Sequence, residues 1–151
     1  MLKFDYVVVG SGLAGLYAAY KASMMGNVAV ITKSLVRESN SFNAQGGIAA
    51  VTSEDDNPEI HKSDTLIAGR GLCEENSVDI LVNEGPERIQ EIIANNMKFD
   101  TENGVLALGL EGGHHKRRIL HAGGDSTGRW ITEFAISKVE TQDNITVFEN
   151  T

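Results

Sequence analysis

Short apolar segments alternate with a helical segment at the start of the chain. Residues 4–9 (FDYVVV) are β-branched and aromatic and are followed by glycine, which predicts a buried strand. Residues 13–25 favour a helix that ends at Gly26, and residues 28–32 (VAVIT) predict a second buried strand. Near-continuous apolar strands around a helix are typical of a parallel sheet that is covered on both faces. The pattern therefore predicts a βαβ unit and an α/β fold.

Polar loops and amphipathic helices follow this unit. Residues 33–47 predict a polar loop, residues 48–51 a short strand and residues 52–59 an exposed acidic turn. Two helices are predicted over residues 60–68 and 77–95. One face of the second helix collects apolar side chains, those of Val78, Leu81, Val82, Ile89, Ile92 and Ile93.

The C-terminal part of the chain predicts a strand, a helix and a final strand. Residues 116–122 (KRRILHA) predict the first strand of this part. Asp125 or Ser126 is expected to cap a helix that ends near Lys138, and residues 145–149 (ITVFE) predict the last strand. The chain has 151 residues and no internal repeat or linker, so its length predicts a single domain.

A glycine-rich turn joins the first predicted strand to the first helix. Gly10 allows a tight turn, Gly12 lets a pyrophosphate approach the backbone, and Gly15 permits close packing of helix on strand. The helix N-terminus offers N–H groups and a partial positive charge to phosphates. A glycine pattern placed between a strand and a helix predicts a bound dinucleotide. The full motif is Gly10-Ser11-Gly12-Leu13-Ala14-Gly15.

The end of the second strand lacks one part of the dinucleotide fingerprint. An acidic side chain normally stands there and holds the ribose hydroxyls, but this chain has Thr32-Lys33-Ser34. Lys33 fits the 2′-phosphate of NADP, and it equally fits a nucleotide contact in a variant flavoprotein. The fingerprint alone leaves the identity of the dinucleotide open.

Charge and composition narrow the class of partner. The formal net charge of −8 argues against a nucleic acid, which needs a clustered basic surface. No apolar stretch reaches membrane-spanning length, and glycines interrupt the apolar N-terminal segment, so neither a membrane partner nor a signal peptide is predicted. The single cysteine, Cys73, cannot form an internal disulfide, which favours a reducing compartment and a cytoplasmic location.

A second glycine-containing loop lies at residues 39–47 (SNSFNAQGG). Its Gly46-Gly47 pair lets backbone N–H groups approach a planar or anionic ligand. The segment AQGGIAAV at this place resembles the superfamily of FAD enzymes that contains succinate dehydrogenases, fumarate reductases and L-aspartate oxidases. The loop also carries hydrogen-bonding side chains at Ser41, Asn43 and Gln45.

This resemblance implies a fold and a domain organisation. The fold is an FAD-binding Rossmann-like domain of the glutathione-reductase type with a parallel sheet. Residues 1–151 are then an incomplete fragment, the N-terminal part of the FAD-binding domain. The capping domain and the C-terminal helical domain of the superfamily are expected to be absent from this chain.

Three segments point to the L-aspartate oxidase branch of the superfamily. The membrane-bound succinate and fumarate enzymes carry a histidine that is covalently bonded to the flavin, and Asn40 occupies that position here. FAD is therefore expected to be bound non-covalently. Residues 111–129 resemble the EGGHxxRRILHA…TGR segment of L-aspartate oxidases, and residues 64–73 (DTLIAGRGLC) also match the pattern of that branch.

The resemblance also implies the residues of the site. Glu111 is expected to face the substrate, because aspartate has an ammonium group that succinate lacks and a carboxylate can orient it. Without the resemblance, Glu111 would be interpreted as a surface charge before a glycine turn. The expected FAD-binding residues come from the two glycine-containing segments and the end of the second strand: Gly10, Ser11, Gly12, Leu13, Ala14, Gly15, Lys33, Asn40, Ser41, Phe42, Asn43, Ala44, Gln45, Gly46 and Gly47.

The segment after Glu111 contains several histidines and arginines. No cysteine or carboxylate completes a zinc spacing there, so no metal is predicted. Guanidinium groups pair well with carboxylates, which suits a dicarboxylate substrate, but some of these side chains are expected to be structural. The sequence leaves the roles of His114, His115, Arg117 and Arg118 open.

The activity implied by the resemblance is FAD-dependent oxidation of L-aspartate to iminoaspartate. Oxygen or fumarate would reoxidise the flavin, and the product would feed quinolinate synthase in NAD biosynthesis. The fragment alone is expected to be inactive. One alternative is a soluble fumarate reductase or succinate dehydrogenase-like flavoprotein, and another is a dinucleotide-binding module without catalysis, linked to NADP through Lys33.

Overall fold

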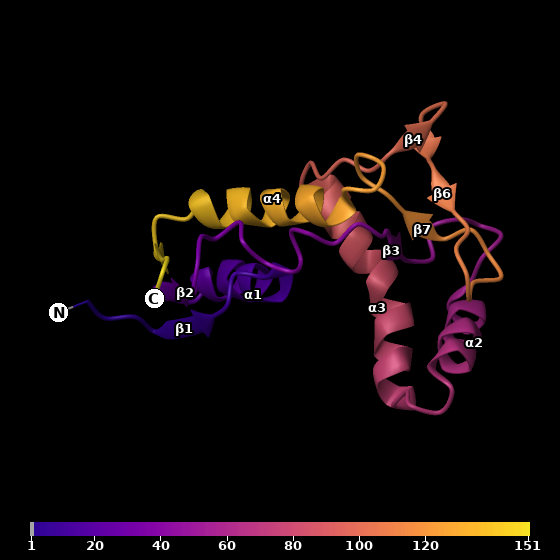
Figure 1. Ribbon diagram of the computed structural model, residues 1–151, viewed down its shortest axis with the longest axis horizontal. Coiled ribbons are helices and arrows are strands. Elements are labelled where there is room, and N and C mark those ends of the chain that lie inside the picture. The colour runs from indigo at the N-terminus through magenta and orange to yellow at the C-terminus, as the bar shows by residue number, and fades with distance from the viewer. Residues whose placement is uncertain (1) are drawn as a thin grey trace. The chain divides into compact units, whose positions relative to one another are not determined.

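The computed structural model describes residues 2–151, which form two compact units (Figure 1). Of the described residues, 2–45 and 126–151 form unit 1, and 46–125 form unit 2. The chain leaves unit 1 after the loop at residues 33–45, forms unit 2, and returns to add a helix and a strand to unit 1. That residues 1–151 belong to one domain stays a prediction.

Unit 1 contains a parallel sheet in the order β1-β2-β8. Strand β1 (Tyr6–Val9) is followed by helix α1 (Leu13–Ser23) and strand β2 (Val28–Ile31). Helix α4 (Thr127–Glu140) then leads into strand β8 (Ile145–Phe148). The predicted βαβ unit, the C-terminal helix and the last strand are therefore confirmed, together with the α/β fold class.

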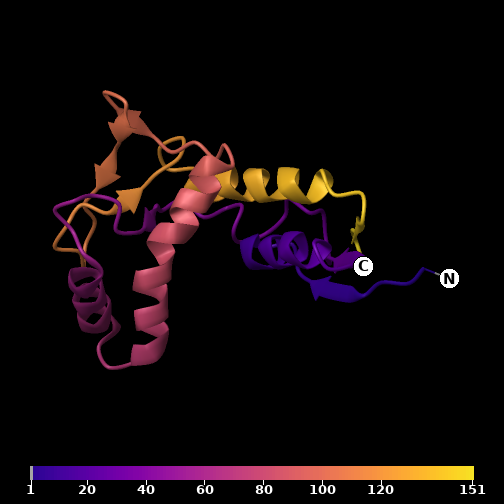
Figure 2. The same ribbon diagram turned by 180° about the vertical axis from the view of Figure 1, so that it is seen from behind.

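The core of unit 1 lies around its central strand. Val28, Ala29 and Val30 of β2 are at most 2% exposed, as near-continuous apolar runs in a parallel sheet require. Helices α1 and α4 run side by side in both ribbon views (Figures 1 and 2). Leu16 of α1 and Ile136 of α4 belong to one buried hydrophobic cluster. The two helices therefore share one core with the sheet.

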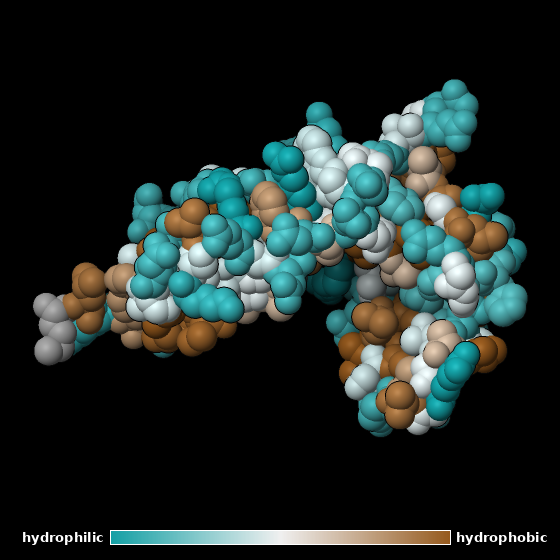
Figure 3. Space-filling model, viewed as in Figure 1, coloured by the Kyte–Doolittle hydropathy of each residue, from teal (hydrophilic) through white to brown (hydrophobic). Residues whose placement is uncertain are grey.

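Strand β1 is less buried than its sequence predicts. Val7 is 58% exposed and Val9 is 81% exposed, whereas Val8 packs against the core. Successive side chains of a strand point to opposite faces, so the face of β1 that carries Val7 and Val9 has no helix over it in the described residues. Figure 3 shows the resulting apolar surface over β1. The prediction of a buried strand was wrong for this face.

Unit 2 combines a helical hairpin with small antiparallel sheets. Helix α2 (Pro58–Gly69) and helix α3 (Glu75–Ala94) pack against each other, as Figure 2 also shows. Asn57 caps α2 by accepting a hydrogen bond from the N–H of Ile60 at 3.0 Å, and Pro58 begins the helix. The chain leaves α2 through Arg70, whose φ of 49° is left-handed.

The strands of unit 2 were only partly predicted. Strands β3 (Ile48–Ala49) and β7 (Ile119–Leu120) were expected, and they pair in a sheet with β6 (Leu108–Gly109). Strand β6 and the hairpin of β4 (Thr101–Glu102) and β5 (Val105–Leu106) were not predicted from the sequence. Positive φ angles at Asn103 and Gly104 form the tight turn of this hairpin, and the Asn-Gly pair was the available signal.

Helix α3 buries a narrower stripe than its sequence predicts. Val78, Val82 and Ile89 are buried, but Leu81 is 60% exposed. Figure 3 shows apolar surface along the α2–α3 hairpin. Among the described residues, no helix is both long enough and apolar enough to cross a membrane.

Candidate functional site

The glycine-rich turn between β1 and α1 has the backbone that its sequence requires. Gly10 has a φ of +107°, which disfavours any side chain there. A Cβ atom on Gly15 would lie 2.1 Å from the carbonyl oxygen of Gly10, so helix and turn approach too closely for any other residue. Ser11 Oγ and Thr32 Oγ1 form a hydrogen bond of 2.9 Å that ties the ends of β1 and β2 together. The conformational roles predicted for Gly10 and Gly15 are thus observed.

The N-terminus of α1 fits a phosphate group. The first turn of this helix contains no acidic side chain that would repel an anion. Ala14 is exposed, and the first-turn N–H groups of a helix have no partners within the helix itself. The N–H of Leu13 donates to Ser41 Oγ at 3.1 Å, so a side chain from the second loop meets this helix end. The two predicted FAD-binding segments therefore meet within unit 1.

The second loop is fixed between the first turns of α1 and α4. The N–H of Gly128 donates to the carbonyl oxygen of Ala44 at 3.0 Å. A Cβ atom on Gly128 would lie 2.3 Å from the carbonyl oxygen of Ser41, so only glycine fits there. The guanidinium of Arg129 lies 5.9 Å from the centre of the Phe42 ring. Gly128 was not among the predicted FAD-binding residues, although the TGR motif that carried the resemblance contains it.

The remaining predicted FAD-binding residues of unit 1 present their side chains to solvent, where a ligand can reach them. They are Lys33, Asn40, Asn43, Ala44 and Gln45.

The glycines at the end of the loop belong to unit 2 and differ from each other. An added Cβ atom on Gly46 would meet nothing within 4 Å, so open space surrounds this residue. On Gly47 it would lie 2.3 Å from Ile119 Cγ2 and 2.6 Å from the carbonyl oxygen of Leu120. Packing against β7 therefore explains why Gly47 is glycine, whereas Gly46 leaves room for another molecule.

Glu111 stands just after β6, with its side chain half exposed. Its Oε1 atom lies 3.2 Å from Nε2 of His121, which follows β7. The Glu111 side chain is 51% exposed and that of His121 is 26% exposed. The carboxylate is thus held by a neighbouring ring and still open to an external cation.

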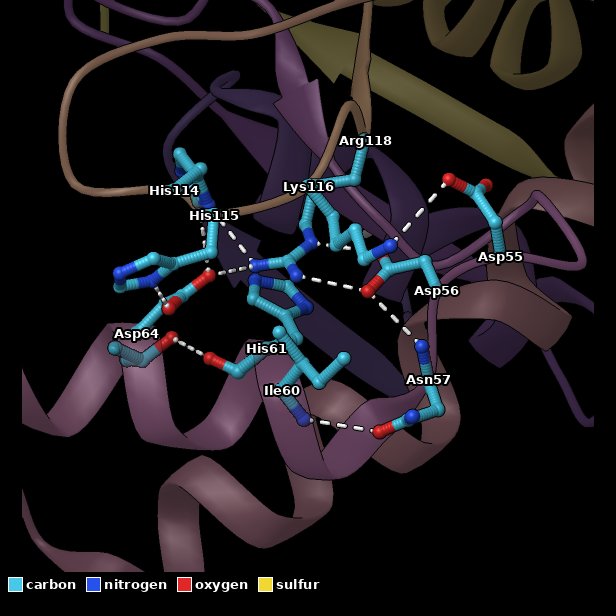
Figure 4. A network of polar contacts seen from close by, with 11 residues as sticks. Asp55, Asp56, Asn57, Ile60, His61, Asp64, His114, His115, Lys116 and Arg118 are labelled. Carbon is cyan, nitrogen blue, oxygen red and sulfur yellow. Dashed lines mark hydrogen bonds and ion pairs between the residues drawn. The ribbon is translucent and has the colours of Figure 1, made fainter.

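A second charged cluster of unit 2 is completely buried. Arg118 has no exposed surface. Its guanidinium forms a bidentate salt bridge with the Asp56 carboxylate, with both N–O distances at 2.8 Å (Figure 4). Its remaining terminal nitrogen donates to Asp64 Oδ2 at 2.6 Å. The prediction that residues 52–59 form a fully exposed acidic turn was therefore wrong at Asp56. Arg118, 62 positions further along the chain, covers that carboxylate.

Two histidines complete this cluster. A guanidinium only donates, so Nδ1 of His114 accepts from Arg118 at 3.2 Å. Both the backbone N–H of His115, at 3.0 Å, and its ring Nδ1 donate to Asp64 (Figure 4). Arg117 is exposed and donates to the carbonyl oxygen of Leu108 at 3.4 Å. The structure therefore places Arg118 in a buried structural network, and the half-buried His114 and the exposed His115 are bonded to its edge.

The network shifts the pKa of its members. Burial acts to raise the pKa of Asp64, but hydrogen bonds from His115 and Arg118 outweigh it and bring the pKa to about 2. Hydrogen bonding to Asp56 raises the pKa of Arg118 above its ordinary value. Burial, together with the positive charge of Arg118, lowers the pKa of His61 below 6.5. Within residues 2–151, no group of three or more histidine, cysteine or acidic side chains is placed to hold a metal ion.

Comparison with known families identifies the fold and the cofactor. Residues 5–151 match the family described as FAD binding domain. The chain belongs to this family. The glycine-rich turn and the loop that meets it are thus parts of an FAD binding domain, and FAD is the dinucleotide that the fingerprint had left open.

The curated relatives of this FAD binding domain include L-aspartate oxidases. The chain is 49% identical to the L-aspartate oxidase of Streptomyces coelicolor over 145 residues, which cover 95% of this chain and 25% of the relative. It is 47% identical to the chloroplastic L-aspartate oxidase of Oryza sativa over 146 residues, or 96% of this chain and 22% of the relative. The resemblance stated from the motifs is confirmed. The chain spans about a quarter of the length of these relatives.

Solved structures confirm the fold of this FAD binding domain. The Sdh1 complex of Mycobacterium smegmatis in the apo form matches with a TM-score of 0.89 and 30% identity, over 97% of this chain and 27% of that chain. The quinol fumarate reductase FrdA of E. coli matches with a TM-score of 0.90 and 28% identity, over 99% of this chain and 26% of that chain. These flavoproteins share the fold at lower sequence identity than the L-aspartate oxidases do.

Proposed function

We propose that the complete protein carrying this chain oxidises L-aspartate to iminoaspartate with FAD as cofactor. The observation that carries the proposal is Glu111, a half-exposed carboxylate in a chain nearly half identical to L-aspartate oxidases. Aspartate and succinate both carry two carboxylates, and aspartate alone adds an ammonium group. A carboxylate with an open oxygen attracts and orients such a group.

FAD, when bound, supplies the redox chemistry by accepting a hydride from the substrate carbon. The chain's own residues bind and orient. The first turn of α1 would receive the phosphates, and the loop at Asn40–Gln45, which Gly128 and Ser41 fix in place, would hold the rest of the cofactor. Asn40 has no nucleophilic ring nitrogen, so we propose that FAD is held without a covalent bond. After acid precipitation of the holoprotein, the yellow colour should remain in the supernatant.

The wider setting of the reaction follows from the same resemblance. We propose oxygen or fumarate as the electron acceptor, quinolinate synthase as the enzyme that uses the product, and a cytoplasmic location. Residues 1–151 would be the N-terminal part of the FAD-binding domain, and a capping domain would supply further catalytic groups. The fragment by itself should then show no aspartate turnover above that of free FAD.

Glu111→Gln in the complete protein tests the assignment. The change keeps the shape of the side chain and removes its charge, so aspartate oxidation should lose on the order of 1–3 kcal/mol of transition-state stabilisation, measured as kcat/KM. Fumarate reduction should change much less, because fumarate has no ammonium group. Equal loss of both activities would assign Glu111 to folding or to flavin binding.

Activity assays and the absorbance spectrum of the wild-type protein distinguish the alternative functions. Turnover of succinate or fumarate without aspartate would identify a soluble fumarate reductase-like enzyme, which the match to the E. coli quinol fumarate reductase keeps as the second candidate. A preparation without the visible absorbance of flavin would favour the NADP-binding module instead.

A further inference from the structure

We infer that His121 is the positioning residue that aims the Glu111 carboxylate, and so sets the preference for an amino acid over a plain dicarboxylate. This inference rests on the proposed function. Nε2 of His121 lies 3.2 Å from Oε1 of Glu111, and an ionised carboxylate only accepts hydrogen bonds. The proton of this bond therefore resides on Nε2, and the ring holds one carboxylate oxygen while the other stays open.

The sheet register explains why the ring has little freedom. Strand β3 pairs with β7 so that Ile48 lies opposite Leu120, and extending this register by one residue places Gly47 opposite His121. A Cβ atom on Gly47 would lie 2.9 Å from His121 Nε2. On the other side, a Cβ atom on Gly109 would lie 2.9 Å from His121 Cε1. The imidazole thus occupies space that two glycines leave between neighbouring strands.

The backbone of His121 is fixed as well. Its carbonyl oxygen accepts a hydrogen bond of 2.7 Å from the N–H of Asp100. The Asp100 carboxylate in turn accepts the N–H groups of Gly123 and Gly124, each at 2.9 Å. A ring fixed at its backbone and enclosed by two glycines can orient a flexible glutamate, which otherwise has several rotamers in solvent.

This arrangement gives Gly47 and Gly109 a shared function. Both are needed for the His121 ring to reach Glu111, and a side chain at either position would displace the ring. The pair is half exposed, so its contribution to stability is small and its effect lies in the direction of the carboxylate.

The test compares variants of the complete flavoprotein. His121→Phe keeps a flat ring and removes the hydrogen bond, and His121→Gln restores a donor. His115→Phe is the matched control, because that histidine also contacts a carboxylate, that of Asp64, outside the proposed site. For each variant, kcat/KM is measured for aspartate oxidation and for fumarate reduction, and flavin absorbance gives the bound FAD.

We expect His121→Phe to lower kcat/KM for aspartate about tenfold, since misorientation of a binding group is costly, and to change fumarate reduction by less than about threefold. His121→Gln should recover most of the loss, and His115→Phe should leave the ratio of the two activities unchanged. In a Glu111→Gln background, His121→Phe should cause little further loss, because its partner is already altered.

Equal loss of both activities, no recovery with His121→Gln, or fully additive losses in the double variant would each overturn the inference while leaving the proposed function intact. A wild-type protein that holds FAD but does not oxidise aspartate would instead overturn the proposed function, and the inference with it.

Discussion

Two carboxylate clusters flank strand β7. They differ in the burial of their side chains and in the number of hydrogen bonds that each carboxylate accepts. Arg118 precedes the strand and His121 follows it. Around Arg118, the side chains of Asp56 and Asp64 are at most 2% exposed and fully engaged. At His121, the Glu111 carboxylate has one neighbour and is half exposed. The same residue types can therefore stabilise a fold or receive a ligand, depending on burial and on how many bonds remain open.

Removing the centre of the buried cluster should have the largest effect. Arg118→Met leaves the Asp56 and Asp64 carboxylates buried without a counter-charge, which typically costs about 3–5 kcal/mol of unfolding free energy. Urea unfolding of the holoprotein measures this loss. Arg117→Met is the matched control, because the neighbouring arginine is exposed, and it should change stability by no more than about 0.5 kcal/mol. Similar losses for both variants would contradict the distinction between buried and exposed charges.

Acid should weaken the buried cluster next. The folded-state pKa of Asp64 is about 2 against an ordinary 3.8, so its contribution is complete above about pH 4 and is lost as the pH falls from 3.8 towards 2. The shift corresponds to about 2 kcal/mol. Unfolding free energy followed from pH 7 downwards should show this loss, and stability that stays flat between pH 4 and 2.5 would disprove it.

The lowered pKa of His61 adds an earlier step to the same profile. Below pH 6.5 the unfolded chain binds a proton that the folded protein takes up only at lower pH, so stability should begin to fall there. His61→Phe should remove this first step and leave the Asp64 step in place. A first step that persists in His61→Phe would assign it to another group.

The exposed cluster should give the smallest change in stability. Glu111→Gln removes the charge of a half-exposed side chain with a single partner, so the unfolding free energy should change by no more than about 0.5 kcal/mol. The same variant is expected to lose aspartate oxidation. A change of several kcal/mol in stability would place Glu111 with the structural charges.

The βαβ segment at the start of unit 1 and the dinucleotide turn were determined by the sequence at short range. Strand and helix signals between residues 4 and 32 depend on neighbouring residues, and so do the roles of Gly10 and Gly15, whose contacts lie within one turn. The loop at residues 39–47 was recognised as an FAD segment because its own residues carry the motif. Local chemistry and local motifs are sufficient for such features.

The tertiary structure decided everything that depends on distant pairs. Asp56 is buried because Arg118 reaches it, Gly128 must be glycine because the loop at Ser41 and Ala44 packs against it, and Val9 is exposed because no helix covers it. The short strand β6 exists only because β7 pairs with it. His121 gained its candidate role in the same way, since a sequence records neither which glycines leave room for a ring nor which carboxylate the ring then meets. Burial and hydrogen-bond partners arise from packing between segments far apart in the chain, and a pattern read along one chain contains no distances between them.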